Sequence, residues 1–401
     1  MINLLPLVLA LLLVAALLRV NFVFHALYIL FGVYVLASLW SRRASEGIQV
    51  RRTYDTRALL GDTLTVKLEV ENRTLWPLPW LRVHERLPVG LAAPPFFARL
   101  VSLVPRERCE LTYQLHCRQR GYYLLGPLQL TSGDVFGLRS AERELAAPAH
   151  VTVYPKIVAL DELGLPSKSP FGHLRTQQPL YEDPSRVVGV RDYQSGDSLR
   201  KINWKTTAAS GRLQVKKLEP AMTLQTVLLL NLNLEEYERQ DAYYAAELAI
   251  VVAASLANHL AGLRQEVGLV TNGRDPLSDL PVSGVSARKG QGHLVQILEL
   301  LGRVEVSTGS DFCGLLRSQM AHLPWGSTLV VVTGRESDDL WETLLALRKA
   351  GFSVVVVFCD YPSRFGFDRA RGRGASLGFR CHRIWKEEDM DVWRRRVRSW
   401  S

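Results

Sequence analysis

Two long apolar runs stand at the start of the chain. Residues 2–18 and 22–40 contain no Asp, Glu, Lys or Arg, and three residues beginning with Arg19 separate them. Each run is close to the roughly 20 residues that a membrane-spanning helix needs. No basic residue precedes the first run and a second run follows at once, which favours two spanning helices over a secretory signal. The pattern therefore predicts a transmembrane helical hairpin over residues 1–41, with residues 2–40 in contact with the membrane.

From about residue 46 the continuous apolar pattern changes to an alternating one. Residues 64–70 and 111–117 alternate apolar and polar side chains, as strands with one buried face do. Turn-forming residues separate these runs, and the two prolines within residues 76–80 are incompatible with a helix. We predict a β-sandwich domain over residues 46–155. The triplet that begins at Asn72 matches a glycosylation acceptor, but we expect it to form only a turn.

Residues 156–219 are interpreted as a linker that contains one distinctive motif. Beyond them, residues 220–401 alternate apolar strands with helical stretches, which is typical of a parallel sheet flanked by helices. This order predicts an α/β doubly wound domain with a basic tail. The expected strands are residues 226–232, 267–270, 328–333 and 353–358, and the expected helices are residues 241–260, 294–301, 315–322 and 340–349.

The charge distribution indicates the orientation of the chain in the membrane. Lys and Arg number 49 against 39 Asp and Glu, a net charge of +10. Four arginines cluster directly after the second apolar run, and basic residues beside a spanning helix mark its cytoplasmic side. We therefore expect a multi-pass protein of the cell membrane with cytoplasmic soluble domains. The four arginines are Arg42, Arg43, Arg51 and Arg52.

Two further features of composition narrow the function. The five cysteines are odd in number and include no CxxC pair, which agrees with a reducing compartment and makes a cysteine zinc site improbable. The basic excess lies in residues 42–57, 191–217 and 364–401. A nucleic-acid binder instead shows one basic face interleaved with stacking aromatics, so no nucleic-acid partner is expected.

The densest run of polar, basic and aromatic residues is residues 191–205. Gly196 suits a tight turn, and Asp197 or Ser198 can cap a short helix on which Arg200 and Trp204 stack as a cation–π pair. Two interpretations remain open: a structural clamp between two domains, or a basic surface for an acidic partner. The motif residues are Arg191, Tyr193, Gly196, Asp197, Arg200, Ile202 and Trp204.

Enzyme signatures are weak. Neither GxGxxG after a strand nor GxxxxGK[ST] occurs, so both nucleotide-binding fingerprints are absent. Residues 374–378 match the GxSxG nucleophile pattern. However, an arginine-rich loop is expected before Ser376 and a strand after it, whereas a nucleophile elbow needs a strand before and a helix after. We therefore favour a non-enzyme without a cofactor. The alternative is a metal- or Ser-dependent hydrolase that uses the strand-end face of the α/β domain.

The chain resembles a family. The two-helix anchor, the phrase from Arg120-Gly121 to Phe136-Gly137-Leu138, and Tyr193-x-x-Gly196-Asp197-x-x-Arg200-x-Ile202-x-Trp204 are similar to the bacterial domain-of-unknown-function family 58. This resemblance implies that the α/β domain is like a von Willebrand factor type A domain. It also implies a setting alongside MoxR-type AAA+ ATPases.

Von Willebrand type A domains often hold Mg²⁺ with an Asp-x-Ser-x-Ser run after the first strand, a Thr, and an Asp after the fourth. The matching positions here are Asn231, Asn233 and Glu235, and the fourth strand ends in Thr333 without an Asp. Mg²⁺ is usually held through carboxylates, so these three residues are weak metal candidates and no tightly held Mg²⁺ is expected.

The family resemblance and the position of the strand ends together predict the function. Ligands of doubly wound sheets bind at the carboxyl ends of the strands. A membrane-anchored adaptor, or scaffold, is therefore expected to bind a protein partner there, with a MoxR-type AAA+ ATPase as the natural candidate. Arg335 offers a planar fork that can hold a partner carboxylate. The expected partner-binding residues are Asn231, Asn233, Glu235, Thr333 and Arg335.

Overall fold

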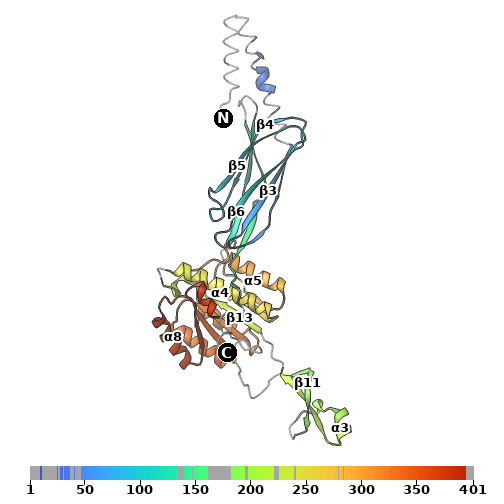
Figure 1. Cartoon of the computed structure of the whole chain (residues 1–401), viewed down its shortest axis with the longest axis vertical. Coiled ribbons are helices and arrows are strands. Elements are labelled where there is room, and N and C mark those ends of the chain that lie inside the picture. Colours follow the sequence, from blue (N-terminus) through green and yellow to red (C-terminus); the bar gives the residue numbers. More distant parts are fainter. Residues whose placement is uncertain are drawn as a thin grey trace, which may run out of the picture. The chain divides into compact units, whose positions relative to one another are not determined.

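A computed structural model describes most of the chain (Figure 1). The described residues are 10, 25, 28, 29, 31–36, 40, 47–133, 140–146, 148–160, 182–194, 197–220, 225–238, 241–278, 280–282 and 284–393. They form two compact units, Met1–Lys156 with Leu298–Val304, and Ile157–Ile297 with Glu305–Ser401.

The predicted hairpin over residues 1–41 lies almost wholly outside the described residues. Residues 31–36 within it are described, and they are helical. Within the part of the chain that the structure describes, one helix is long and apolar enough to cross a membrane, namely α4 (Ala242–Gly262). Because 72% of its apolar window is buried, α4 is a core helix of the α/β domain. The hairpin remains a prediction.

The first unit contains a β-sandwich-like region, which confirms that prediction. Along β3 the side chains of Leu64, Val66, Leu68 and Val70 alternate with exposed polar ones and join one apolar core. The strands pair in three sheets, β1-β3-β6, β5-β4-β8-β9 and β2-β10-β7. They are β1 (Ile48–Thr53), β2 (Arg57–Leu59), β3 (Thr63–Asn72), β4 (Leu78–Arg86), β5 (Phe96–Leu103), β6 (Arg108–His116), β7 (Gly121–Leu125), β8 (Leu128–Gly133), β9 (Ser140–Ala146) and β10 (Ala149–Tyr154).

Asn72 at the end of β3 organises a turn, as predicted. Its side chain is fully buried, and Nδ2 donates hydrogen bonds to the carbonyls of Trp76 and Val104 at 2.9 and 3.2 Å. Its Oδ1 accepts from the amide of Thr74 at 3.0 Å. Since the side chain has no exposed surface and its amide is fully used, Asn72 is not a glycan acceptor in this fold.

A buried charged group lies inside the β-sandwich core. The carboxylate of Glu85 on β4 is fully buried and pairs with Arg52 on β1, whose side chain is 7% exposed. The hydroxyl of Tyr113 on β6 donates to Glu85 Oε2 at 2.8 Å. Burial raises the pKa of Glu85, and the cation of Arg52 and the bond from Tyr113 oppose this shift. Each of the two charges therefore relies on the other to offset its lost hydration.

The second unit contains the predicted mostly parallel sheet. Its strand order is β15-β14-β13-β16-β17-β18, and β15 alone is antiparallel to its neighbour. The four predicted strands are present, and β15 and β18 extend the sheet at its edges. The strands are β13 (Gln225–Leu230), β14 (Glu266–Thr271), β15 (Val285–Arg288), β16 (Thr328–Thr333), β17 (Ser353–Phe358) and β18 (Arg380–Arg383); the helices besides α4 are η2 (Leu234–Glu236), α5 (Gln291–Arg303), α6 (Phe312–Gln319), α7 (Asp338–Lys349), α8 (Arg364–Ser376) and η3 (Glu387–Trp393).

The basic loop predicted around Ser376 is instead helical. Helix α8 ends at Ser376 and β18 follows, so helix and strand stand in the reverse of the order that a nucleophile elbow needs. The Ser376 hydroxyl donates to the carbonyl of Arg373 at 2.7 Å. Gly374 lets α8 lie against β18, because a Cβ there would come within 2.4 Å of Cys381 Sγ.

We expect Glu85→Ala to lower the free energy of unfolding of the β domain by about 3 to 5 kcal/mol, because the substitution leaves the charge of Arg52 buried without its partner. Urea denaturation of the detergent-solubilised chain measures the change. Glu69→Ala is the matched control: it removes a half-exposed carboxylate of β3 and should change stability by less than about 0.5 kcal/mol. Equal effects of the two substitutions would contradict this account of the core.

Candidate functional site

The carboxyl ends of three parallel strands are joined by a network of buried amides. Asn231, directly after β13, donates from Nδ2 to Thr333 Oγ1 at the end of β16 at 3.0 Å. Its Oδ1 accepts from the amide of Asn233 and from Nδ2 of Asn272, which follows β14, both at 3.0 Å. Asn231 and Thr333 are fully buried. One side chain therefore fixes the spacing of β13, β14 and β16 at this edge of the sheet.

Two further side chains extend the network to the loop before α6. Asn233 donates from Nδ2 to the carbonyl of Ser310 at 3.1 Å, and Asn272 Nδ2 donates to Ser310 Oγ at 2.9 Å. The hydroxyl of Ser307 donates to the carbonyl of Asn272 at 3.0 Å. Asn272, Ser307 and Ser310 were not among the predicted site residues. Of these, Asn272 alone has a sequence signal, its position immediately after a strand.

Glu236 is the half-buried acid of this edge. It lies in η2, and its Oε2 accepts from Asn231 Nδ2 at 2.7 Å. Burial raises the pKa of Glu236; the hydrogen bonds from Asn231 and Asn233 lower it, and the nearby carboxylates of Asp311 and Asp339 raise it further. The negative form is therefore disfavoured at this position.

The residues present do not fit a Mg²⁺ ion of the kind that the family resemblance implies. The oxygen of Asn231 already accepts two hydrogen bonds, and the oxygen of Asn233 accepts from the amide of Glu235 at 3.3 Å. The Asn231 NH₂ group donates to Thr333 Oγ1 and to Glu236 Oε2. These two oxygens, which a cation would need as ligands, are therefore already hydrogen-bonded. Binding a hard cation here requires breaking these bonds.

Arg335 follows β16 and faces acidic groups of its own domain. Its Nε donates to the carboxylate of Asp360, after β17, at 3.1 Å, and its Nη2 pairs with the half-exposed carboxylate of Glu238. The guanidinium lies 5.8 Å from the ring centroid of Tyr361. Burial raises the pKa of Asp360, whereas the amide of Glu238 and the cation of Arg335 lower it. Arg335 is therefore held in place yet remains 37% exposed.

The five predicted partner-binding residues thus fall into two classes. Asn231, Thr333 and Asn233 are buried and hold the loops together, so they do not offer a surface to a partner in this conformation. Glu235 and Arg335 reach solvent. Their binding role remains a prediction, as does the absence of a metal.

The sequence motif lies on a separate two-stranded element, here called the arm, which comprises residues 182–220 (Figure 1). Strand β11 (Glu182–Asp192) pairs with β12 (Gln214–Pro220), and the 3₁₀ turn η1 (Leu199–Lys201) and helix α3 (Trp204–Ser210) lie between them. Ile202, between η1 and α3, forms an isolated β-bridge with Val215 on β12. Among the residues of the arm whose side chains the structure describes, these two are the buried apolar ones. Gly196 lies outside the described residues.

Two of the interactions predicted for the motif differ in the structure. Asp197 does not cap a helix: its carboxylate accepts two hydrogen bonds from Arg191, at 2.6 and 2.7 Å, which lower its pKa. Asn203 caps α3 instead. Arg200 belongs to η1 whereas Trp204 begins α3, and Ile202 between them is extended, so the two do not share a helix. The local cause is the Asn203 cap, which starts a new helix one residue before Trp204.

The arm exposes two large apolar side chains and several basic ones. Trp204 and Leu199 are each 67% exposed, and Arg200, Lys205 and Arg212 are exposed as well. Residues 191–216 contain six basic and two acidic residues, a net charge of +4. Within the arm the Trp204 ring packs into no core, so it is available either to another domain or to a partner; the clamp and the basic surface both remain predictions.

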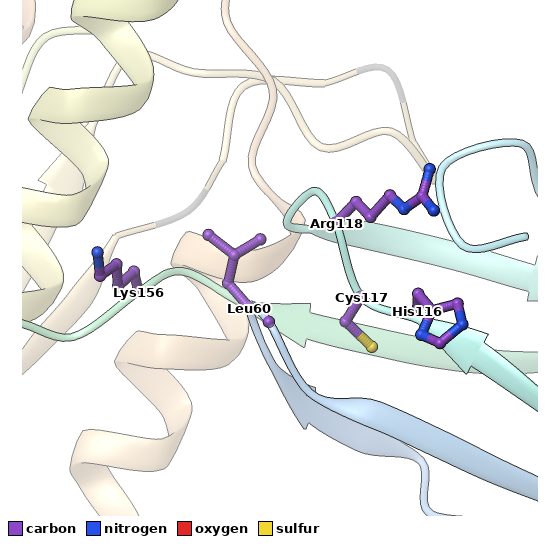
Figure 2. A pocket seen from close by; sticks show the side chains of 6 residues that line it. Leu60, His116, Cys117, Arg118 and Lys156 are labelled. Carbon is purple, nitrogen blue, oxygen red and sulfur yellow. The ribbon is translucent and has the colours of Figure 1, made fainter.

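An open pocket of about 480 Å³ in the β domain is a weaker candidate (Figure 2). Figure 2 shows the side chains of Arg118 and Lys156 extending in opposite directions, so the two cations do not converge on one ligand. Burial raises the pKa of the Cys117 thiol, which keeps it protonated and unreactive at neutral pH. The lining residues are Leu60, Gly61, His116, Cys117, Arg118 and Lys156.

Comparison with known proteins supports the family resemblance. Residues 189–360 match the family model described as "Protein of unknown function DUF58", which confirms the predicted resemblance over this part of the chain. The matched span includes both the motif and the strand-end edge. The uncharacterized protein YeaD of Bacillus subtilis (strain 168) is 23% identical over 299 residues, which cover 73% of this chain and 71% of that protein.

Two solved structures resemble part of the chain. The CARDB domain of the PF1109 protein from Pyrococcus furiosus has a TM-score of 0.21 and 19% identity, covering 26% of this chain and 91% of that one. A beta-glucosidase from Listeria innocua has a TM-score of 0.16 and 13% identity, and the match spans 26% of this chain and 16% of that one. At these TM-scores neither likeness bears on function.

We expect Glu236→Gln to stabilise the α/β domain at neutral pH. The raised pKa of Glu236 means that the folded state binds its proton more tightly than the unfolded state, so the carboxylate costs stability as the pH rises above the ordinary value of 4.5. The amide keeps the acceptor for Asn231 and removes the charge. The gain in melting temperature should be present at pH 7 to 8 and fade towards pH 4.5. The exposed Glu235→Gln is the control, and an equal gain there would contradict the role of burial.

Proposed function

We propose that the chain is a membrane-anchored, cytoplasm-facing adaptor whose α/β domain acts like a von Willebrand factor type A domain and binds a protein partner. The carrying observation is the exposure of Trp204, the last residue of the family motif. A large aromatic ring that packs into no core, beside exposed basic residues, is typical of a protein-binding hot spot. Trp and Arg are also the residue types that most often dominate binding energy.

The strand-end edge provides the second proposed contact. Its buried amides are satisfied internally, so the edge is rigid before a partner arrives, and a rigid surface loses little entropy on binding. Arg335 projects from this edge with Nε committed to Asp360 and Nη2 paired with the half-exposed Glu238. A carboxylate of the partner can replace Glu238 and leave the buried bond to Asp360 intact.

A MoxR-type AAA+ ATPase is the proposed partner, on the strength of the family resemblance. A pull-down from detergent-solubilised membranes tests this choice directly. Recovery of another protein through the same two surfaces would keep the adaptor proposal and change the identity of the partner.

We expect Trp204→Ala to leave the melting temperature close to that of the wild type, because the ring is 67% exposed, and to weaken partner binding by about 2 kcal/mol or more. Calorimetry of the full chain with the ATPase measures the affinity. Trp325→Ala is the matched control, since this ring is 52% exposed outside the arm. A large loss of stability with unchanged affinity would return the motif to a clamp.

We expect Arg335→Ala to weaken partner binding by about 1.5 to 3 kcal/mol, the usual contribution of a hydrogen bond to a charged group. Glu238→Gln should strengthen binding, because it removes the internal carboxylate that competes for Arg335. The exposed Arg369→Ala on α8 is the charge-matched control. Titrations are run with Mg²⁺ and with a chelator; affinity lost on chelation, with no effect of Arg335→Ala, would favour a metal-dependent site instead.

A further inference from the structure

One end of the β domain has two adjacent exposed loops, residues 73–77 and 104–107, here called the loop end. Asn72 joins them, since its Nδ2 donates to the carbonyls of both Trp76 and Val104. The second loop is closed by Glu107, whose amide donates to the carbonyl of Val104 at 3.2 Å and whose carboxylate accepts from the amide of Val104 at 2.7 Å. The two loops are therefore built as one surface.

The loop end exposes apolar side chains that the domain does not need for its own core. Leu75 is 72% exposed and Val104 58%, and the Trp76 ring is more than one-third exposed. Arg106 lies at the tip of the second loop with φ of +63°, a left-handed conformation that is uncommon outside glycine and turns its side chain into solvent. Apolar tips beside a cation are the composition of a surface that enters the boundary between lipid and water.

The chain that comes from the predicted membrane hairpin is attached at this same place. Trp40, the last residue of the second apolar run, donates from Nε1 to the carbonyl of Pro77 at 2.9 Å. Its ring centroid lies 5.4 Å from that of Trp76. Gly47, just before β1, accepts at its carbonyl from the amide of Arg73 at 3.0 Å. A Cβ at Gly47 would come within 2.1 Å of Thr74 Cγ2, so any larger residue here requires the Thr74 side chain to shift.

We propose that the loop end is a lipid-contacting surface, with Leu75, Trp76 and Val104 at the membrane interface and Arg106 facing lipid phosphates. This inference rests on the proposed membrane anchor. Trp40 ends an apolar run, and tryptophans at the ends of spanning helices lie at the level of the lipid headgroups. Because Trp40 contacts Trp76 and Pro77 directly, the loop end lies at the same level. The membrane anchor therefore holds these side chains against the lipid surface.

The position of the anchor excludes other surfaces of the β domain from the same role. Val89 is 81% exposed, but its loop lies at the other end of the strands, where the amide of His116 donates to the carbonyl of Leu91. Along β3 and β6, His116 pairs with Thr63 whereas Arg108 pairs with Glu71, next to Asn72. An exposed apolar residue of similar size thus stands at each end of the β domain, and contact with lipid is expected at one of them.

The test places a bimane label on Leu75→Cys or on Val89→Cys in the full chain, reconstituted into phosphatidylcholine–phosphatidylglycerol vesicles with plain or brominated acyl chains. The signal from native cysteines is measured on the wild type and subtracted. We expect brominated lipid to lower the emission at position 75 by about twofold or more, as for a side chain inserted below the headgroups, and to leave position 89 unchanged. Adding Arg106→Glu should reduce the quenching at position 75, and Arg118→Glu, at the other end, should not.

Alkaline carbonate extraction of the same vesicles separates the two proposals. Protein retained in the membrane with no quenching at position 75 would overturn the lipid contact and leave the anchor standing. Equal quenching at positions 75 and 89 would also overturn it, since the contact would not be confined to one end. Protein released by carbonate would remove the anchor, and the lipid contact with it.

Discussion

The arrangement of the strand-end edge depends on one side chain, the buried amide of Asn231. A parallel sheet brings the carboxyl ends of its strands together, and the polar groups there lose water when the loops close over them. Asn231 answers this cost by donating to Thr333 and Glu236 and accepting from Asn233 and Asn272. A carboxylate at this position accepts hydrogen bonds only, and it would stand beside Glu236 without a donor between them.

This constraint explains why the charged side chains that reach solvent do not lie at the centre of the strand-end edge. The amides that join the strands there use all their hydrogen bonds within the edge, so they make the edge rigid and leave no free ligand atoms. Charges that reach solvent come from the loops further along the sheet, where Arg335 lies between the buried Asp360 and the exposed Glu238. A surface of this kind favours a partner whose carboxylate takes the place of Glu238 at Arg335, because the buried Asp360 then keeps its own bond to Arg335 and no buried charge is left unpaired.

The sequence predicts the elements of this molecule better than its contacts. Continuous apolar runs such as Thr328–Thr333 are recognisable as central parallel strands, and the alternation after Ser376 predicts β18. Strand β15 was missed because an edge strand of four residues carries little pattern. Helix α8 was missed because glycines and arginines conceal its periodicity. Asn231 and Asn233 were found from their position after a strand. Their burial, and their partners Asn272 and Ser310 from distant loops, follow only from the three-dimensional pairing of β13 with β14.

The arm, unlike the α/β domain, has almost no apolar core of its own. A two-stranded hairpin is at best marginally stable by itself, and the described part of the arm buries Ile202 and Val215 as its apolar residues. The bidentate pair of Arg191 with Asp197 and the Asn203 cap hold its local shape without enclosing a core. Residues that are costly to expose, such as Trp204 and Leu199, remain at its surface. Under the proposed adaptor role, these side chains complete their packing on the partner.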